Sequence, residues 1–226
     1  MPSVLDNLNE IRSNIDAAAA KTGRKGSDVQ LIAVTKGVKA ERIREAVEAG
    51  LCGLGENRVQ EAEEKTAALG VPAEWHMIGH LQTNKAKTAA ELFSVVQSVD
   101  SLKLAQKLSQ EAQALNKTLR ILLEVNVSGE EQKHGFSPDE LYGVVGQIAA
   151  LPALKIEGLM GMAPNTEDTA PRREAFKKLK GLFIVCKGLK YPTVEMKTLS
   201  MGMSDDYQIA VEEGANMVRI GRALFR

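Results

Sequence analysis

One lysine stands where a reactive amine would be useful. Lys36 follows the apolar run 31–34 (LIAV), and in an extended strand its side chain shares a face with Ile32 and Val34. A lysine seldom follows such a run unless its ammonium group reaches water or has a chemical task. An amine held out of water there becomes a nucleophile able to form a Schiff base with a carbonyl compound, and a strand-end lysine that simply reaches solvent is the alternative.

Two glycine-containing turns near the C-terminus have the composition of an anion site. The first is the segment 199–204 (LSMGMS), which precedes an expected helix, and the second contains Gly221 and Arg222. Backbone N–H groups in glycine turns and at helix N-termini bind phosphate groups. Helix capping or chain reversal explains each turn alone, but the pair favours a shared phosphate site.

Arg219 lies inside the otherwise apolar stretch 217–220 (MVRI) and shares its strand face with Gly221. A buried guanidinium group needs hydrogen-bond acceptors. A carboxylate of the same chain, such as Glu124 or Glu195, would satisfy it internally. The alternative acceptor is a ring nitrogen or an anionic group of a ligand.

Polar residues also mark two other strand ends. Asn57 in the segment 55–58 (GENR) is expected to cap the helix that follows it. His76 and His80 bracket a strand in the segment 75–80 (WHMIGH). No carboxylate or cysteine set in the sequence completes a metal site with them, so we expect packed or surface histidines and no metal.

The elements that must position these residues alternate regularly along the chain. Short β-like runs are separated by longer runs with helical periodicity. The expected strands are Val29–Lys36, Cys52–Gly55, Glu74–Ile78, Ser94–Val99, Arg120–Val127, Lys155–Met160, Thr193–Leu199 and Met217–Ile220. The expected helices are Val4–Ala20, which precedes the first strand, and Ala40–Ala49, Val59–Leu69, Lys85–Leu92, Ser101–Leu115, Pro138–Leu151, Pro171–Leu189 and Asp205–Glu213.

Strict alternation predicts a parallel sheet, because parallel neighbours need a crossover connection. Eight such units close into a (β/α)8 barrel, the TIM barrel, and we expect one domain over residues 1–226 with an extra N-terminal helix. An open doubly wound sheet is the alternative, but the turn at 35–38 (TKGV) lacks its GxGxxG signature. In a barrel the C-terminal strand ends meet at one rim, which would bring the lysine, the arginine and the glycine turns together.

Composition excludes several classes of partner. The chain has 226 residues, and its 29 basic and 29 acidic side chains give a formal net charge of zero, so no overall charge draws it to nucleic acid or to an anionic membrane. Charged residues interrupt the N-terminal region before a signal sequence could form, and no apolar run approaches a membrane span. Cys52 and Cys186 form no paired motif. We therefore expect a cytoplasmic protein with no nucleic-acid or membrane partner.

Six segments together resemble the pyridoxal 5′-phosphate (PLP) homeostasis protein family, whose fold is related to the N-terminal barrel of alanine racemase. The matching segments are AVTK at 33–36, GENRVQE at 55–61, WHMIGHLQTNK at 75–85, GLMGM at 158–162, LSMGMSDD at 199–206 and VRIGRA at 218–223. They span nearly the whole chain in order. The resemblance implies a fold-type III PLP-binding barrel.

The resemblance also implies roles for individual residues. Lys36 would hold PLP as a Schiff base, Asn57 would line the cofactor ring, and Arg219 would face the pyridine nitrogen. The phosphate group would be received by Ser200, by the backbone around Met201 and Gly202, and by Gly221 and Arg222. Many family members have a small hydroxyl residue in place of Arg222, so that side-chain contact differs in this chain.

Two functions from different classes are compatible with these residues. One is a racemase-like PLP enzyme, which needs an acid or base on each face of its substrate. In the racemases the second such group is a tyrosine from an additional β domain. We expect no such domain, because the eight units extend to the last residues of the chain. None of Tyr142, Tyr191 and Tyr207 falls at an expected strand end.

The sequence therefore favours a non-catalytic, monomeric PLP-binding protein of vitamin B6 homeostasis, with apo PLP-dependent enzymes as recipients. An arginine at the ring nitrogen agrees with this, since its permanent charge weakens the ring as an electron sink. A cofactor-free Schiff-base aldolase is a third possibility, but it leaves Arg219 unexplained.

Overall fold

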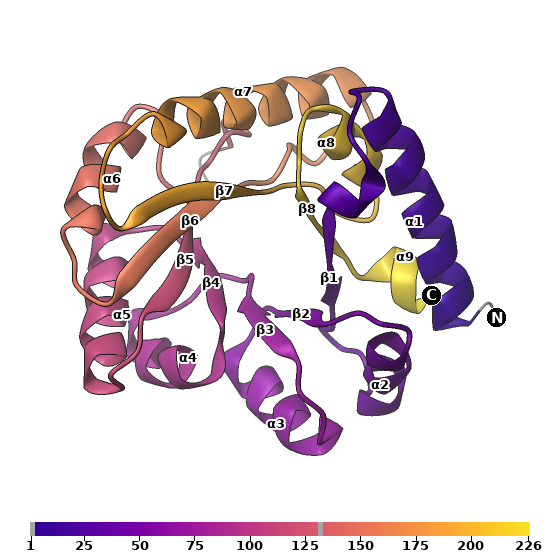
Figure 1. The fold of residues 1–226 in the computed structure, drawn as a ribbon, viewed down its shortest axis with the longest axis horizontal. Helices are drawn as coiled ribbons and strands as arrows, with labels where there is room; N and C mark the ends of the chain where they lie inside the picture. Colours follow the sequence, from indigo (N-terminus) through magenta and orange to yellow (C-terminus); the bar gives the residue numbers. More distant parts are fainter. Residues whose placement is uncertain (1–2, 131–132) are drawn as a thin grey trace.

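Eight parallel strands close into a barrel in their chain order, β1 to β8 (Figure 1). The computed structural model describes residues 3–130 and 133–226. Because β1 pairs in parallel with both β2 and β8, the sheet has no free edge at that point. The predicted (β/α)8 barrel is confirmed, and the doubly wound alternative is excluded.

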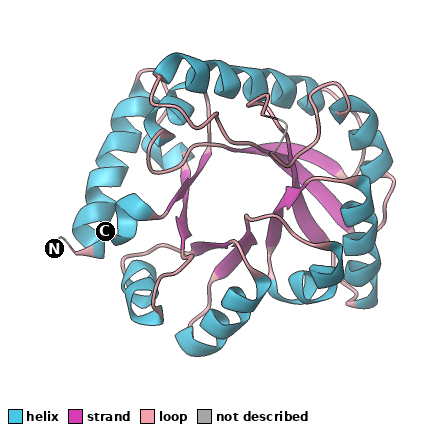
Figure 2. Cartoon of the chain, turned by 180° about the vertical axis from the view of Figure 1, so that it is seen from behind, coloured by secondary structure: helices cyan, strands magenta, loops and turns pink. Residues whose placement is uncertain are grey.

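Helices surround the strands on the outside (Figure 2). The strands are β1 Gln30–Val34, β2 Gly53–Glu56, β3 Glu74–Met77, β4 Val95–Val99, β5 Leu119–Glu124, β6 Leu154–Met160, β7 Val194–Ser200 and β8 Met217–Ile220. The α-helices are α1 Val4–Ala20, α2 Ala40–Glu48, α3 Val59–Leu69, α4 Ala86–Leu92, α5 Leu102–Ala114, α6 Leu141–Ala149, α7 Thr169–Lys187, α8 Tyr207–Glu212 and α9 Arg222–Phe225. The 3-10 turns are η1 Gly26–Asp28 and η2 Thr83–Lys85.

The boundary error that bears on the position of Lys36 concerns the end of β1, while β5 and α6 also differ from their expected bounds by up to three residues. The strand was expected to reach Lys36, but it ends at Val34, and Lys36 lies in the turn that follows. The last ladder hydrogen bond of this strand is donated by the Thr35 N–H to the Gly55 carbonyl over 2.9 Å. Gly37 then takes a φ of 67°, a left-handed conformation that turns the chain toward α2. Lys36 therefore lies beyond the end of the strand, and the conformation of the turn, rather than the strand alternation, decides where its side chain points.

Glycines on β2 make room inside the barrel. A Cβ atom at Gly53 would lie 2.6 Å from Cδ1 of Ile32, and one at Gly55 would lie 2.9 Å from Cγ2 of the same side chain. Ile32 on β1 is fully buried and occupies this space. Val95, Leu122 and Met160 form a second buried apolar cluster, separate from the main core. The barrel is therefore packed with side chains, and a ligand must bind at its rim.

The N-terminal helix closes the ring beside the end of the chain. A capping box between Ser3 and Asp6 begins α1, and its bounds agree with the prediction. The Asn7 side chain donates to the Leu224 carbonyl over 3.0 Å, which places α1 against α9. The short helix α9 was not predicted from the sequence. Among the described helices, none is both long and apolar enough to span a membrane.

Candidate cofactor site

Lys36 stands between two hollows at the C-terminal rim of the barrel. One has a volume of about 660 Å³, and Arg219, Gly221 and Arg222 line it together with Lys36. The other has a volume of about 490 Å³, and Asn57 lines it together with Lys36. The structure thus brings four other predicted site residues to the two sides of the Lys36 amine.

The backbone on both sides of Lys36 is clamped from α3. Lys65 donates from Nζ to the Thr35 carbonyl over 2.7 Å, and the Gly37 N–H donates to Oε2 of Glu61 over 3.3 Å. Lys65 also lies 2.5 Å from Oε1 of Glu56, a fully buried carboxylate that accepts a hydrogen bond from the Thr35 hydroxyl over 2.7 Å. The Lys36 side chain itself is exposed. These hydrogen bonds fix the backbone position of Lys36, while its side chain stays free to move.

We expect Lys65→Met to lower the free energy of unfolding by roughly 3 kcal/mol, because it leaves the buried Glu56 carboxylate without its cation. Urea unfolding measures this loss. Lys103→Met, on the exposed face of α5, is the matched control and should change little. Adding Glu56→Gln to Lys65→Met should restore part of the stability. A single variant as stable as the wild type would contradict the clamp.

Oxygen atoms at the ends of β6 and β7 hold Arg219 inside the barrel. Its Nη1 donates to the Ser200 carbonyl over 2.9 Å and to the Ser200 hydroxyl over 2.7 Å, and its Nη2 donates to the Gly161 carbonyl over 3.0 Å. The Ser200 hydroxyl in turn donates to Oε1 of Gln97 over 2.6 Å. Gln97 also contacts Nδ1 of His76 at 2.9 Å. A buried polar chain therefore runs from β3 to β8 and orients the guanidinium group.

Arg219 remains a cation at neutral pH. Burial lowers its pKa to about 10, while the charges of Glu124 and Asp206 favour the protonated form. Within the described residues, neither Glu124 nor Glu195, the two carboxylates considered from the sequence, accepts a hydrogen bond from Arg219. Glu195 is exposed and lies 2.5 Å from Nζ of Lys155. The acceptors of Arg219 are instead the carbonyls of Ser200 and Gly161 and the Ser200 hydroxyl. These groups are neutral, so no second charge is buried beside the guanidinium group at hydrogen-bond distance.

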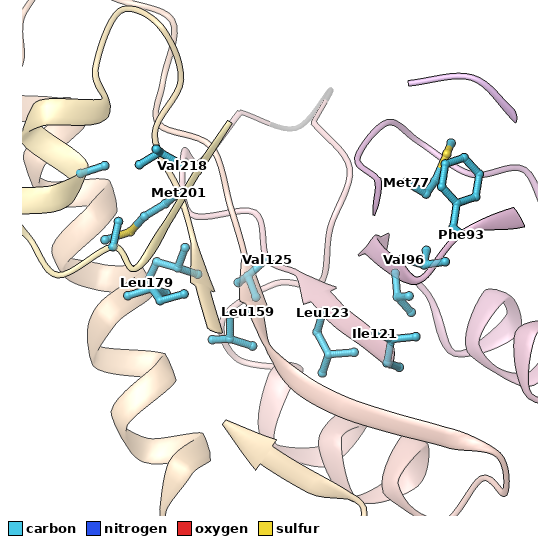
Figure 3. Close-up of a cluster of buried hydrophobic side chains, with 14 of the residues drawn as sticks. Met77, Phe93, Val96, Ile121, Leu123, Val125, Leu159, Leu179, Met201 and Val218 are labelled. Carbon is cyan, nitrogen blue, oxygen red and sulfur yellow. The ribbon is translucent and has the colours of Figure 1, made fainter. Parts of the chain in front are cut away.

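Ser200, Met201 and Gly202 lie behind the cavity wall. Ser200 and Met201 are fully buried, and the Met201 N–H is bonded to the Met217 carbonyl at 3.1 Å. The Met201 side chain lies in the hydrophobic core with Val218 (Figure 3). The Ser200 hydroxyl is already hydrogen-bonded to Gln97 and Arg219, and it thereby holds the Arg219 guanidinium group in its orientation. Direct phosphate contacts from these residues stay predictions.

The loops after β7 and β8 are joined to each other at the rim. The Ala223 N–H donates to the Ser204 hydroxyl over 3.2 Å, and Arg222 pairs with Asp205. The N–H groups of Gly202, Ser204, Gly221 and Arg222 donate to no acceptor within the described residues. Together with the Arg219 cation, such free donors suit a phosphate dianion. A compound with an aldehyde and a phosphate therefore fits the donors around this hollow.

Gly221 packs closely against β1 as well as lining the hollow. A Cβ atom added there would lie 3.2 Å from both Cβ and the carbonyl oxygen of Val34 on β1. Gly202 has a φ of 93°, and a Cβ atom there would lie 2.5 Å from Cβ of Ala210. Both glycines hold their loops tightly against the barrel. Larger residues at these positions would displace the loops themselves.

Asn57 does not cap α3 as expected. The N-cap residue is Arg58, and no side chain caps that helix within the described chain. Asn57 instead lines the smaller hollow, and Gly79 packs so closely on it that a Cβ atom at Gly79 would lie 2.7 Å from Cα of Asn57. This contact fixes the loop after β2 against the loop after β3, beside Lys36.

Glu124, at the end of β5, is a buried carboxyl group that sequence reasoning treated only as a partner for Arg219. Burial raises its pKa to about 7, and repulsion from Asp100 adds to this, while Arg219 and His80 oppose it. The folded protein therefore holds this proton more tightly than the unfolded chain. Its contribution to stability is present below pH 4.5, the ordinary value for the group, and is lost as the pH rises through about 7.

Glu124→Gln should remove this pH dependence. The difference between the two pKa values corresponds to a stability difference on the order of 3 kcal/mol. Relative to the wild type, we expect the variant to gain that much in free energy of unfolding between pH 4 and pH 8, measured by urea unfolding. The exposed Glu195→Gln variant should show no such gain. Parallel pH profiles for wild type and Glu124→Gln would overturn the assignment.

A histidine cluster lies at the same rim, where none was expected. Nδ1 of His80 is 2.8 Å from Oδ2 of Asp100, and the rings of His80 and His134 stack with centroids 3.9 Å apart. Asp100 is thus the carboxylate that the sequence did not supply. It was missed because the three residues come from three loops, far apart in the chain.

Comparison with known proteins agrees with this geometry. The profile of the alanine racemase N-terminal domain matches residues 7–226. Pyridoxal phosphate homeostasis proteins of Pseudomonas aeruginosa and Pasteurella multocida are 42% and 40% identical over 226 residues. These alignments cover 100% and 99% of this chain, and 96% and 97% of the respective relatives. The chain belongs to the pyridoxal phosphate homeostasis protein family. The resemblance predicted from the sequence is confirmed.

Solved structures extend the family comparison. PipY of Synechococcus elongatus PCC7942, in its structure with PLP bound, superposes with a TM-score of 0.86 at 35% identity, over 99% of this chain and 100% of that chain. Alanine racemase of Clostridium difficile 630 superposes with a TM-score of 0.74 at 18% identity, over 96% of this chain and 55% of that chain. The first resembles this chain over the full length of both chains, and the second shares its barrel fold. The names of the curated relatives indicate a homeostasis protein rather than a catalyst.

Proposed function

We propose that this protein binds PLP at the barrel rim, holds it covalently on Lys36 and releases it to apo PLP-dependent enzymes. The observation that carries the proposal is the hollow of about 660 Å³ in which the Lys36 amine, the Arg219 cation and the turn at Gly221 and Arg222 meet. The PLP-bound structure of PipY supports the choice of cofactor.

The residues around this hollow match the functional groups of PLP. When bound, PLP supplies an aldehyde that forms a Schiff base with a lysine amine. Lys36 offers that amine from a clamped turn with its side chain free. The free N–H groups of Gly221 and Arg222 offer donors for the phosphate group. Asn57 lines the hollow on the other side of the lysine, where it can contact the ring.

Arg219 sets the electronic character of the site in this proposal. Ser200 and Gly161 orient its fixed cation, which would disfavour a proton on the ring nitrogen of PLP bound beside it. A ring that stays unprotonated is a weaker sink for electrons from the α-carbon of an amino acid. The site therefore suits storage of the cofactor better than carbanion chemistry.

The tyrosines do not provide a racemase acid or base in this arrangement. Tyr207 is buried and its hydroxyl accepts a hydrogen bond from Asn14 over 3.0 Å. Tyr142 and Tyr191 are exposed, and neither lines the hollow around Lys36 and Arg219. We propose a non-catalytic, single-domain protein that acts as a monomer, and the racemase-like enzyme is the alternative.

Transfer of the cofactor tests the proposal. The protein loaded with PLP is mixed with an apo PLP enzyme in the presence of a phosphatase that destroys free PLP. We expect the enzyme to gain activity, whereas the same concentration of free PLP should give almost none. If the loaded protein and free PLP behave alike, delivery by this protein is contradicted. If the protein takes up no PLP at all, the binding proposal fails as well.

A further inference from the structure

Three side chains from three neighbouring loops converge on one point at the barrel mouth. His80 follows β3, Asp100 follows β4, and His134 lies in the connection between β5 and α6. One nitrogen from each imidazole and one oxygen from the carboxylate all lie within 4.8 Å of one another. The group is separate from the hollow that contains Arg219 and the loops after β7 and β8.

The donor atoms lie close enough together to share one ion. Oδ2 of Asp100 is 2.8 Å from Nδ1 of His80 and 3.8 Å from Nδ1 of His134. Tetrahedral zinc, with bonds of about 2.1 Å to nitrogen and oxygen, sets its ligand atoms about 3.4 Å apart. The two observed distances bracket that value. Because the two rings are stacked almost in parallel, at least one of these exposed imidazoles must rotate so that both nitrogen lone pairs point to one ion.

The surrounding structure fixes the positions of Asp100 and of the loop that carries His134. The Asp100 side chain is only 10% exposed, while those of His80 and His134 are 44% and 56% exposed. Ser101 caps α5 directly after Asp100. The loop bearing His134 is tied to β5 by a hydrogen bond from the Phe136 N–H to the Glu124 carbonyl over 2.8 Å. The carboxylate is thus a fixed base, and the two imidazoles form an outer face open to water.

The ordinary ion pair does not account for all three residues. Asp100 bonds His80, but its oxygen is beyond hydrogen-bond distance of His134, whose ring instead stacks on His80 at an interplanar angle of 13°. Two imidazole nitrogens facing one carboxylate oxygen are the donor set that zinc and related divalent ions prefer.

We propose that His80, Asp100 and His134 form a binding site for a divalent transition-metal cation of the zinc class, with at least one coordination position open to solvent. His80 also lines the hollow shared by Lys36 and Asn57. The site therefore lies at the edge of the proposed cofactor pocket, on the side opposite the phosphate loops. Metal binding there joins the loops that follow β3, β4 and β5.

Calorimetric titration of the full-length, chelator-treated protein with Zn²⁺ alone tests this site. We expect one ion per chain, and affinity that falls toward acidic pH because protons compete for the ligands. His80→Asn, His134→Asn and Asp100→Asn should each weaken binding at least about tenfold. Titration with Co²⁺ should give a visible absorption spectrum typical of nitrogen and oxygen ligands, and the same variants should lose it.

Cys52→Ser is the matched control, because Cys52 is an exposed thiol outside the cluster that could bind zinc by itself. It should leave the affinity unchanged. The two histidine variants change exposed side chains and decide the question even if Asp100→Asn does not fold. Stoichiometric zinc binding that survives both histidine variants, or that disappears in Cys52→Ser, would overturn the proposal. Absence of binding to the wild type would do the same, whether or not the protein binds PLP.

Discussion

Lys36→Ala should abolish covalent retention of PLP. In the wild type the Lys36 amine stands between the two hollows at the rim, and borohydride should fix the cofactor to it irreversibly. The variant has no amine at that point, so essentially no cofactor should remain after reduction and denaturation. The measurement is the mass of the intact chain after borohydride treatment, with and without PLP.

Lys39→Ala is the matched control for this result. Lys39 is also exposed and belongs to the same loop, but it is the N-cap residue of α2 and lines neither hollow at Lys36. This variant should retain the full adduct. Lys36→Ala should still bind some PLP reversibly, because the donors at Gly221 and Arg222 do not depend on the amine. An undiminished adduct in Lys36→Ala would place the attachment elsewhere.

Exchange of the α-proton of amino acids should be nearly absent in the loaded wild-type protein. Among the described residues, no tyrosine lines the hollow that contains Lys36 and Arg219, and the Arg219 cation would weaken the ring of bound PLP as an electron sink. We expect deuterium exchange at the α-carbon of L- and D-alanine to be slower than about 1 s⁻¹, the low end of ordinary enzyme turnover. The measurement is proton NMR of the amino acid in deuterated buffer.

An alanine racemase assayed in the same buffer is the positive control. A panel of other amino acids extends the test to substrates that alanine does not represent. Exchange at 1 s⁻¹ or faster, on the order of ordinary enzyme turnover, with any of them would restore the racemase-like alternative. Slow exchange together with successful cofactor transfer would support the storage function.

The sequence was most informative where the barrel rule applies directly. Residues at C-terminal strand ends must meet at one rim, and this correctly brought Lys36, Arg219 and Gly221 to the same hollow. The alternation of strands and helices predicted the order of the elements, because it depends on local hydrophobic periodicity alone. The predicted end of β1 was wrong by two residues. The left-handed conformation of Gly37 turns the chain there, and the pattern of apolar residues does not show such a turn.

The partners of Arg219 could not be predicted in the same way. Its acceptors, Ser200 and Gly161, belong to the ends of β7 and β6, and Gln97 on β4 completes the chain across the barrel. Which side chains meet inside a closed barrel depends on strand stagger, and local sequence does not encode it. The hydrogen bond between Ser200 and Arg219 was therefore not predicted, while a phosphate contact of Ser200 stays a prediction of the family resemblance.

The histidine cluster was missed for a related reason. His80 and His134 are separated by more than fifty residues, and neither lies in a metal-binding spacing motif. Their contact arises because the connection bearing His134 is bonded back to the end of β5 at Phe136, which leaves the His134 ring stacked on that of His80. A search for carboxylates and histidines at successive strand ends, including long loops, would have placed Asp100 beside His80.

Peptide mapping of the borohydride-reduced protein tests most directly where the cofactor is attached. The wild-type chain is loaded with PLP, reduced, digested and sequenced by mass spectrometry. The geometry of the rim predicts a single modified lysine, Lys36, in the peptide that follows β1. A modified residue at Lys39, at Lys197 or at any other lysine, with Lys36 unmodified, would contradict the proposed site.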